Sequence, residues 1–378
     1  MLFSVGNLLT QDGDTAVRFW PGNTALSQLN VGIVGDIGTG KTQLLKMLIL
    51  KLRRESLKSQ NSNIPILIFD YKKDFQDEEF LKAVGGRIAN PRNTSMPLNI
   101  LLVPDITDKS AQVIRARALV DIVAKIFRHI GAKQSDRLTE VIVNLYQKLG
   151  YSPTLDDVLT AYKEETGTSD GVVAALNAFS MYKVFSSDIS SHVSFEDFLG
   201  DGVTVIDLSY LTTDDAMKNF IVALFLNEYL GFMMNREKIP PVGDEPKIRF
   251  ISSYLLIDEA VNIMHKHLQA LDSILRMGRE FGIGVMLSSQ FLSDFDDPQD
   301  SYSEKLHTWF IHRVPDISMK ELQSLGIPFS NQDDVNNIKT LKNHESYFSS
   351  LNYDGVFMNE IPFFQIMSEQ TDLADSSE

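Results

Sequence analysis

Cysteine is missing altogether from this chain of 378 residues. Its absence excludes disulfide scaffolds, thiolate zinc sites and cysteine nucleophiles, because each of these needs the sulfur atom itself. Positive charge is also scarce: 35 lysines and arginines stand against 50 aspartates and glutamates, which gives a formal net charge of −15. A protein that coats DNA depends on Lys and Arg to neutralise phosphates, so the sequence excludes a generally basic DNA-coating protein.

Long hydrophobic runs are lacking as well. The longest apolar stretch, Phe220–Met234, contains Asn227 and Glu228. It is shorter than the roughly 20 residues that a membrane-spanning helix needs. The first residues show no basic segment followed by an apolar one, so no secretory signal is visible. We therefore expect no membrane span and a cytoplasmic location.

The chain does contain short apolar runs that alternate with helical patterns. Val31–Val34 predicts a buried strand, which is followed by a glycine-rich turn, an apolar-periodic helix and a second strand at Ile66–Phe69. This order is a βαβ unit. Further strands are predicted at Val203–Ile206, Tyr254–Ile257, Ile283–Ser289 and Trp309–Ile311. Strands that alternate with helices predict a three-layer α/β fold with a mainly parallel sheet.

The chain divides by pattern into four parts. Residues 1–30 contain short strands and turns, and residues 31–105 together with 200–366 carry the α/β pattern. Residues 106–199 are helical in period, and we interpret them as a helical subdomain inserted into the α/β core. Residues 367–378 are polar and acidic, which predicts a flexible tail.

The strongest motif is Gly35–Thr42, which matches the P-loop pattern G-x-x-x-x-G-K-[ST] between a strand and a helix. Its glycines let backbone N–H groups and the helix N-terminus face phosphate oxygens. Lys41 is expected to reach the β- and γ-phosphates, and Thr42 to hold Mg²⁺ through its hydroxyl. We find no guanine-reading N-K-x-D motif, which favours ATP over GTP. The predicted nucleotide-binding residues are Gly35, Gly38, Thr39, Gly40, Lys41, Thr42 and Gln43.

Three apolar runs end in an aspartate, and one of these aspartates should bind the magnesium ion. Asp258 is followed directly by Glu259, whereas Asp207 is followed by residues that offer no base. A second carboxylate beside the metal-holding one can orient the attacking water and accept its proton. We therefore assign Asp258 to Mg²⁺ and Glu259 to the general base. Asp70, with the lysines after it, either borders the nucleotide or belongs to a solvated turn.

Polar residues beside the next strand are further candidates. Gln290 follows Ile283–Ser289, where its amide either senses the γ-phosphate and its water or is an ordinary strand-end group. Arg276 lies four residues after Asp272, which favours a surface ion pair. Arg279 has no acidic residue at that spacing.

One basic stretch stands out from the acidic whole. Between residues 109 and 137 the sequence sets two aspartates against seven basic residues, namely Lys109, Arg115, Arg117, Lys125, Arg128, Lys133 and Arg137. This stretch is either a DNA-facing or interface surface, or an ordinary solvated helix face.

Several segments, in their order along the chain, resemble the HerA–FtsK ATPases. They are Gly35–Thr42, Phe69–Phe75, Val203–Ser209, Ile257–Ala260 and Gly278–Gly284 leading to Ser288–Gln290. The likeness runs from Asn30 to Val314, and its specificity lies in the ordered set.

The resemblance implies a RecA-like P-loop NTPase core that uses ATP and Mg²⁺, assembles as a homo-hexamer and passes double-stranded DNA through a central pore. It also implies that Arg279 is an arginine finger for the neighbouring subunit's nucleotide. Residues 31–43 are similar to the ATPase portion of phosphorothioation-linked restriction proteins of bacteria, which implies a defence role with a nuclease partner. Neither the N-terminal barrel of HerA nor the C-terminal winged helix of FtsK is visible, so the loading mode stays open.

We therefore predict an ATP-hydrolysing ring motor that translocates on double-stranded DNA. The alternative is a secretion- or conjugation-type ATPase that moves protein or DNA. A third possibility is a regulatory switch that binds ATP with little turnover. Glu259 argues against the switch, because a pure switch needs no carboxylate to activate water.

Overall fold

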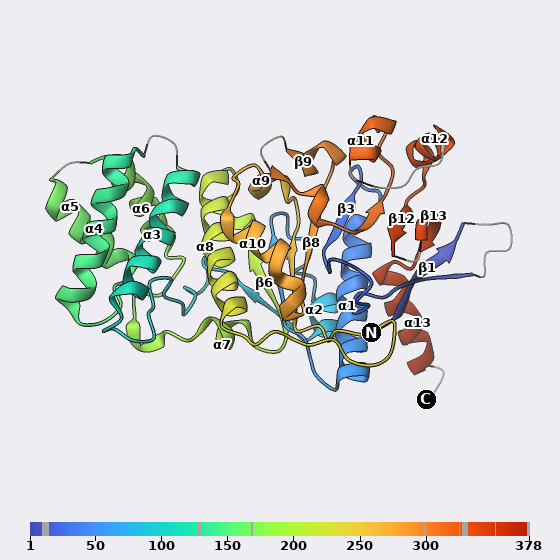
Figure 1. The fold of residues 1–378 in the computed structure, drawn as a ribbon, viewed down its shortest axis with the longest axis horizontal. Coiled ribbons are helices and arrows are strands. Elements are labelled where there is room, and N and C mark those ends of the chain that lie inside the picture. The colour runs from blue at the N-terminus through green and yellow to red at the C-terminus, as the bar shows by residue number, and fades with distance from the viewer. Residues whose placement is uncertain are drawn as a thin grey trace.

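Eleven strands of the described chain form one mixed sheet that runs along most of the molecule (Figure 1). The structure is a computed structural model, and it describes residues 1–9, 15–127, 130–167, 169–297, 300–324, 326, 332–351 and 353–375. The strand order is β2-β1-β13-β12-β11-β3-β8-β7-β4-β6-β5. The section from β11 to β5 is parallel throughout, and the strands from β12 to β2 form an antiparallel edge.

The parallel strands are short and mostly apolar. They are β3 (Val31–Val34), β4 (Ile66–Asp70), β5 (Gly86–Ala89), β6 (Val203–Asp207), β7 (Ser253–Ile257), β8 (Ile283–Ser289) and β11 (Thr308–Ile311). Every residue of all of these except β5 is buried, as expected where helices cover both faces of a sheet. The antiparallel strands are β1 (Phe3–Leu8), β2 (Ala16–Phe19), β12 (Glu345–Ser350) and β13 (Tyr353–Glu360).

Helices cover both faces of the sheet. One face packs against α1 (Lys41–Gln60), α2 (Glu78–Val84) and α13 (Phe363–Asp375), and the other against α8 (Asp215–Met234), α9 (Val261–Met264) and α10 (Gln269–Met277). Successive strand residues point to opposite faces, so in β4 Ile66 and Ile68 join the α1 side while Leu67 and Phe69 join the α8 side. These layers confirm the predicted three-layer α/β fold with a mainly parallel sheet.

A group of helices stands at one end of the molecule, at the left in Figure 1. It consists of α3 (Lys109–Ile126), α4 (Ala132–Leu149), α5 (Leu155–Thr166) and α6 (Gly171–Tyr182), and the short α7 (Phe195–Leu199) leads back to β6. Side chains of Asp108, Thr154 and Asp170 cap the N-termini of α3, α5 and α6. All of these helices lie within residues 106–199, where the sequence pattern is helical in period. No described helix is both long and apolar enough to cross a bilayer.

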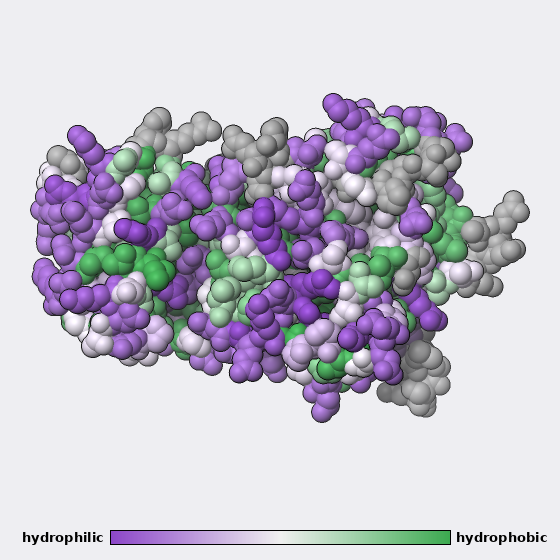
Figure 2. Space-filling view, viewed as in Figure 1, coloured by the Kyte–Doolittle hydropathy of each residue, from purple (hydrophilic) through white to green (hydrophobic). Residues whose placement is uncertain are grey.

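The remaining elements are small. They are α11 (Met319–Ser324), α12 (Gln332–Thr340) and the two-residue strands β9 (Asp296–Asp297) and β10 (Asp300–Ser301). Hydrophilic residues cover much of the face shown in Figure 2, with an apolar patch over the α3–α6 end.

The C-terminal segment differs from the flexible tail predicted for residues 367–378. Helix α13 continues to Asp375, and residues 376–378 lie outside the described part. Its first turn is anchored because Phe363 and Ile366 are buried and Phe363 packs edge-on against Phe80 of α2. Residues 367–375, expected to be part of the acidic tail, thus continue a helix whose first turn is anchored by apolar side chains.

A buried polar pair lies beneath the P-loop. His312 follows β11 and Glu360 ends β13, and both side chains are fully buried with Nε2 and Oε1 3.3 Å apart. The other ring nitrogen, Nδ1, lies 3.2 Å from the carbonyl oxygen of Thr39 in the P-loop. Burial raises the pKa of Glu360 to about 8 and lowers the pKa of His312. At neutral pH the folded pair therefore consists of a protonated Glu360 carboxyl group and a neutral His312 ring.

This pair predicts a pH dependence of stability. Above about pH 6.5 an unfolded chain has released the proton of Glu360 and more than half of the imidazolium proton of His312, whereas the folded Glu360 keeps its proton up to its pKa of about 8. The folded state then binds more protons, so the free energy of unfolding should fall as pH rises through this window, by up to about 2 kcal/mol. Glu360→Gln should remove this decline, as measured by urea unfolding at several pH values.

Glu304→Gln is the matched control, because Glu304 is exposed and should keep the wild-type slope. A Glu360→Gln protein whose stability still declines like the wild type would contradict the protonated state of Glu360.

Candidate nucleotide site

The P-loop connects β3 to α1 at the carboxyl edge of the parallel strands. Gly38 and Gly40 have φ values of 75° and 114°, a backbone region that suits glycine. A cavity of about 460 Å³ opens over the loop. Its lining residues come from the loop, from α1 and from the ends of β4, β7 and β8, with one from the start of β12: Ile37, Gly38, Gly40, Lys41, Thr42, Gln43, Lys72, Asp74, Asp258, Glu259, Gln290 and His344.

Two predicted nucleotide-binding residues act from outside the cavity lining. Gly35 directly follows β3, and its backbone N–H donates to the carbonyl of Ser289 at 3.3 Å. Thr39 is buried, and its hydroxyl donates to the carbonyl of Asp36 at 2.8 Å. Both residues therefore shape the loop from within.

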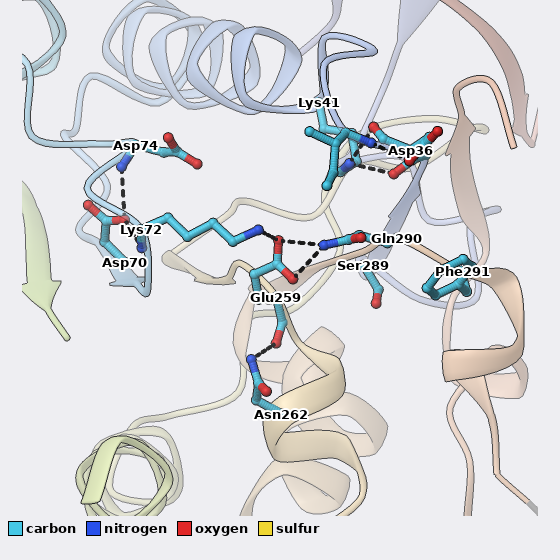
Figure 3. Close-up of polar contacts among 12 residues, drawn as sticks. Asp36, Lys41, Asp70, Lys72, Asp74, Glu259, Asn262, Ser289, Gln290 and Phe291 are labelled. Carbon is cyan, nitrogen blue, oxygen red and sulfur yellow. Dashed lines mark hydrogen bonds and ion pairs between the residues drawn. The ribbon is translucent and has the colours of Figure 1, made fainter. Parts of the chain in front are cut away.

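Lys41 folds back over its own loop. Its ammonium group donates to the carbonyl oxygens of Gly35 and of Asp36, the latter at 3.0 Å (Figure 3). Burial lowers the pKa of Lys41, and the nearby charges of Asp258 and Glu259 oppose that shift. Phosphate oxygens are charged acceptors and bind an ammonium group more strongly than neutral carbonyls do. The lysine is therefore positioned to move onto a phosphate.

Asp258 directly follows β7 and is 6% exposed. Burial, with a contribution from the charge of Glu259, raises the pKa of Asp258 to about 6. Among the described residues, no group of three or more His, Asp or Glu side chains could hold a metal ion by itself. Mg²⁺ in nucleotide sites needs only one or two protein oxygens besides the phosphates. Asp258 and the hydroxyl of Thr42 line the same cavity, so they fit this requirement.

Glu259 is held from two sides. Its carboxylate forms an ion pair with Lys72 and accepts from the Gln290 amide, whose Nε2 lies 3.2 Å from Oε2 (Figure 3). Its φ of 49° is a left-handed conformation that is uncommon for residues with a side chain, and such strain clusters at functional sites. The side chain is only 14% exposed. Glu259 and Gln290, predicted separately, are thus brought into direct contact.

The sequence analysis missed the role of Lys72 and left two readings open for Asp70. The Asp70 carboxylate is fully buried and accepts from the backbone N–H groups of Lys72, Asp74 and Phe75 and from the Gln76 amide. It is therefore neither a solvated turn charge nor a residue of the cavity lining. It holds the turn that presents Lys72 to Glu259. An aspartate at a strand end, two residues before a lysine, is the sequence signal for such a turn.

Arg279 lies at the amino-terminal ends of the parallel strands, whereas the cavity lies at their carboxyl-terminal ends. It belongs to the short 3₁₀ helix Gly278–Phe281 before β8, whereas Gln290 follows β8. The seven residues of β8 span roughly 20 Å at about 3.3 Å per residue. In this chain the Arg279 guanidinium donates to the carbonyl of Thr24 at 2.5 Å. It is therefore remote from the cavity of its own chain.

Other basic residues are partly neutralised within the chain. Arg276 pairs with Asp272 at 2.8 Å, as the sequence spacing predicts. In the basic stretch, Arg115 pairs with Glu228, Lys125 with Asp121 at 3.5 Å, and Arg137 with Glu165 at 2.8 Å. Arg128 lies outside the described residues. The stretch therefore offers DNA less uncompensated charge than its sequence suggests.

Comparison with known proteins places this site in a family. The family described as "Helicase HerA, central domain" matches residues 3–229, well over half of the chain. The DNA import protein CedB of Sulfolobus acidocaldarius is 23% identical over 304 residues, which cover 78% of this chain and 45% of CedB. The chain thus spans less than half the length of this relative.

Solved structures with the same fold include VirB4 and the plasmid coupling protein TrwB. VirB4 of Thermoanaerobacter pseudethanolicus superposes with a TM-score of 0.66 at 16% identity, over 95% of this chain and 96% of VirB4. The plasmid coupling protein TrwB, solved with a non-hydrolysable ATP analogue, gives a TM-score of 0.52 at 14% identity, over 90% and 86% of the two chains. TrwB has also been solved with ADP and Mg²⁺ and with a GTP analogue. With its P-loop and strand-end carboxylates, the chain belongs to the family of HerA helicase central domains and is a P-loop ATPase.

Proposed function

We propose that this chain is the ATP-hydrolysing part of a ring-shaped motor that moves along double-stranded DNA. The observation that carries the proposal is the single cavity that joins Lys41 of the P-loop to Asp258, Glu259 and Gln290. A nucleotide-binding fold without hydrolysis would not need the partly buried carboxylate of Glu259, which Lys72 and Gln290 hold from two sides. The family and the name of the relative CedB support DNA as the substrate of movement.

We infer a role for each side of the cavity from the residues that line it. Lys41 and the backbone N–H groups of the loop bind the β- and γ-phosphates of ATP. Thr42 and Asp258 would hold Mg²⁺, which neutralises charge on the phosphates. Glu259 orients the attacking water and accepts its proton, while Lys72 and Gln290 keep its carboxylate beside the γ-phosphate.

Glu259→Gln should keep ATP binding and lose hydrolysis by about 10²- to 10⁴-fold, the usual contribution of a general base. The amide has nearly the shape of the carboxylate but cannot accept the water's proton. Binding is measured with a fluorescent ATP analogue, and hydrolysis as phosphate release.

Glu165→Gln is the control for that measurement, since Glu165 pairs with Arg137 in the helical group. It should leave both quantities near wild type. If Glu259→Gln weakened binding but kept turnover, the general base would have to be another residue.

The cargo is the second part of the proposal. The VirB4 and TrwB matches concern the fold alone, so a protein-moving motor of the secretion type remains the competing function. The relative CedB is named for DNA import, which favours DNA. The defence role and nuclease partner implied by the sequence resemblance stay predictions.

Duplex DNA should stimulate ATP hydrolysis several-fold, and rising salt should reduce this effect because protein–phosphate contacts release counterions. The measurement is the ATPase rate with and without linear duplex DNA at two salt concentrations. Lys41→Ala should be inactive in both conditions, which excludes a contaminating ATPase. A wild-type rate that DNA does not change would refute DNA translocation while leaving the ATPase intact.

The proposed ring-shaped assembly can be tested through Arg279. Because Arg279 lies across the sheet from its own cavity, it can serve a γ-phosphate only in a neighbouring subunit. Arg279→Ala alone should lower hydrolysis by about 10³- to 10⁵-fold, as loss of an arginine finger does. Mixing these subunits with Glu259→Gln subunits should restore part of the activity, because some interfaces then pair an intact arginine with an intact glutamate.

The control is Arg276→Ala, which removes only a surface ion pair and should stay near wild type. If mixed assemblies form, as measured by mass, and remain inactive, then Arg279 is not the trans finger or hydrolysis requires every interface to be intact.

A further inference from the structure

The strand order indicates how a nucleotide in the cavity would be oriented relative to β3. On one side of β3 lie β8, β7 and β4, whose ends supply Gln290, Glu259 and Lys72. On the other side lie β11, β12 and β13. If the γ-phosphate faces Glu259, the nucleoside half of ATP must extend across the P-loop toward the β12 side.

An aromatic pair lies on that second side. His344 immediately precedes β12, and Phe364 is in the first turn of α13. Their ring centroids are 5.5 Å apart with an interplanar angle of 70°, an edge-to-face arrangement. His344 lines the cavity, and Phe364 is 51% exposed although it is a large apolar side chain.

His344 is fixed directly against the P-loop. Its backbone N–H donates to the carbonyl of Thr39 at 2.9 Å, and its own carbonyl accepts from the N–H of Glu360 at 2.8 Å. A Cβ atom on Gly40 would lie 2.7 Å from His344 Nδ1, so the ring fits only because residue 40 is glycine. Nδ1 is buried and has no hydrogen-bond partner among the described residues. The buried Nδ1 edge of the ring therefore packs against the P-loop backbone at Gly40.

Phe364 is tied to the same place through α1. Its backbone N–H donates to the side-chain oxygen of Gln43 at 3.1 Å, and Gln43 lines the cavity directly after Thr42. The start of α13 is thus anchored on the residue that follows the P-loop motif.

We propose that His344 and Phe364 form the platform on which the purine base of the bound nucleotide rests. The inference builds on the proposed ATPase function, because it uses the direction that Glu259 imposes on the triphosphate. Stacking against the exposed Phe364 ring binds the base through its π-face. The His344 ring, which lines the cavity, adds an edge contact.

The experiment compares ATP with inorganic tripolyphosphate, which has the phosphates but no base. Stacking contributions to a single base predict that Phe364→Ala weakens ATP binding about 5- to 100-fold and leaves tripolyphosphate binding unchanged. Phe364→Trp should restore ATP binding. Both ligands are measured by competition against a fluorescent nucleotide or by calorimetry on the full chain.

Phe291→Ala is the matched control. Phe291 is also a largely exposed phenylalanine, 56% accessible, but it follows Gln290 on the other side of β3. It should change the binding of neither ligand.

Three other outcomes of this experiment would contradict the proposed platform. Unchanged ATP binding in Phe364→Ala overturns the platform, and so does an equal loss of ATP and tripolyphosphate binding, which would show a disturbed phosphate site. A wild-type protein that binds neither ligand would overturn the nucleotide site itself, and the platform with it.

Discussion

The parallel register of four neighbouring strands is the constraint on which the site depends. Val34 of β3 pairs with Ser289 of β8, and Ile257 of β7 pairs with Leu287 of β8. These pairs bring the P-loop, Asp258 and Gln290 to one edge of the sheet, with neighbouring strands about 4.8 Å apart. The next strand, β4, adds the turn that carries Lys72. A slip by one residue would turn every side chain of a strand to the opposite face of the sheet and disrupt its packing against the covering helices, so it is strongly disfavoured.

Buried polar groups then hold the loops that this register places. Asp70 organises the turn after β4, and the His312–Glu360 pair lies directly beneath Thr39 of the P-loop. Both are buried away from water. Because an unpaired polar group is costly in the protein interior, each favours one geometry of the loop that it contacts. The strained backbone of Glu259 persists within this frame. Buried polar groups thus fix the P-loop and the turn after β4, both of which line the candidate nucleotide cavity.

Under the proposed function, the position of Arg279 separates nucleotide binding from catalysis. One chain supplies the P-loop, the proposed magnesium ligands and the proposed general base around a single cavity. Its own arginine lies at the amino-terminal ends of the parallel strands. Under the proposed function, a subunit alone binds nucleotide, whereas full turnover depends on assembly. This arrangement would link hydrolysis to the ring that surrounds DNA.

The sequence by itself determined the local parts of the protein. The motif Gly35–Thr42 specifies its turn through neighbouring residues, and apolar runs that end in acids predicted the strand ends with Asp258 and Glu259. Only the tertiary structure decided which distant groups meet. Lys72 reaches Glu259, and His344 reaches Gly40, across separations of well over a hundred residues. Arg115 is neutralised by Glu228 in the same way. A backbone turn depends on short-range sterics and hydrogen bonds, whereas these contacts depend on sheet order and packing, which no local pattern encodes.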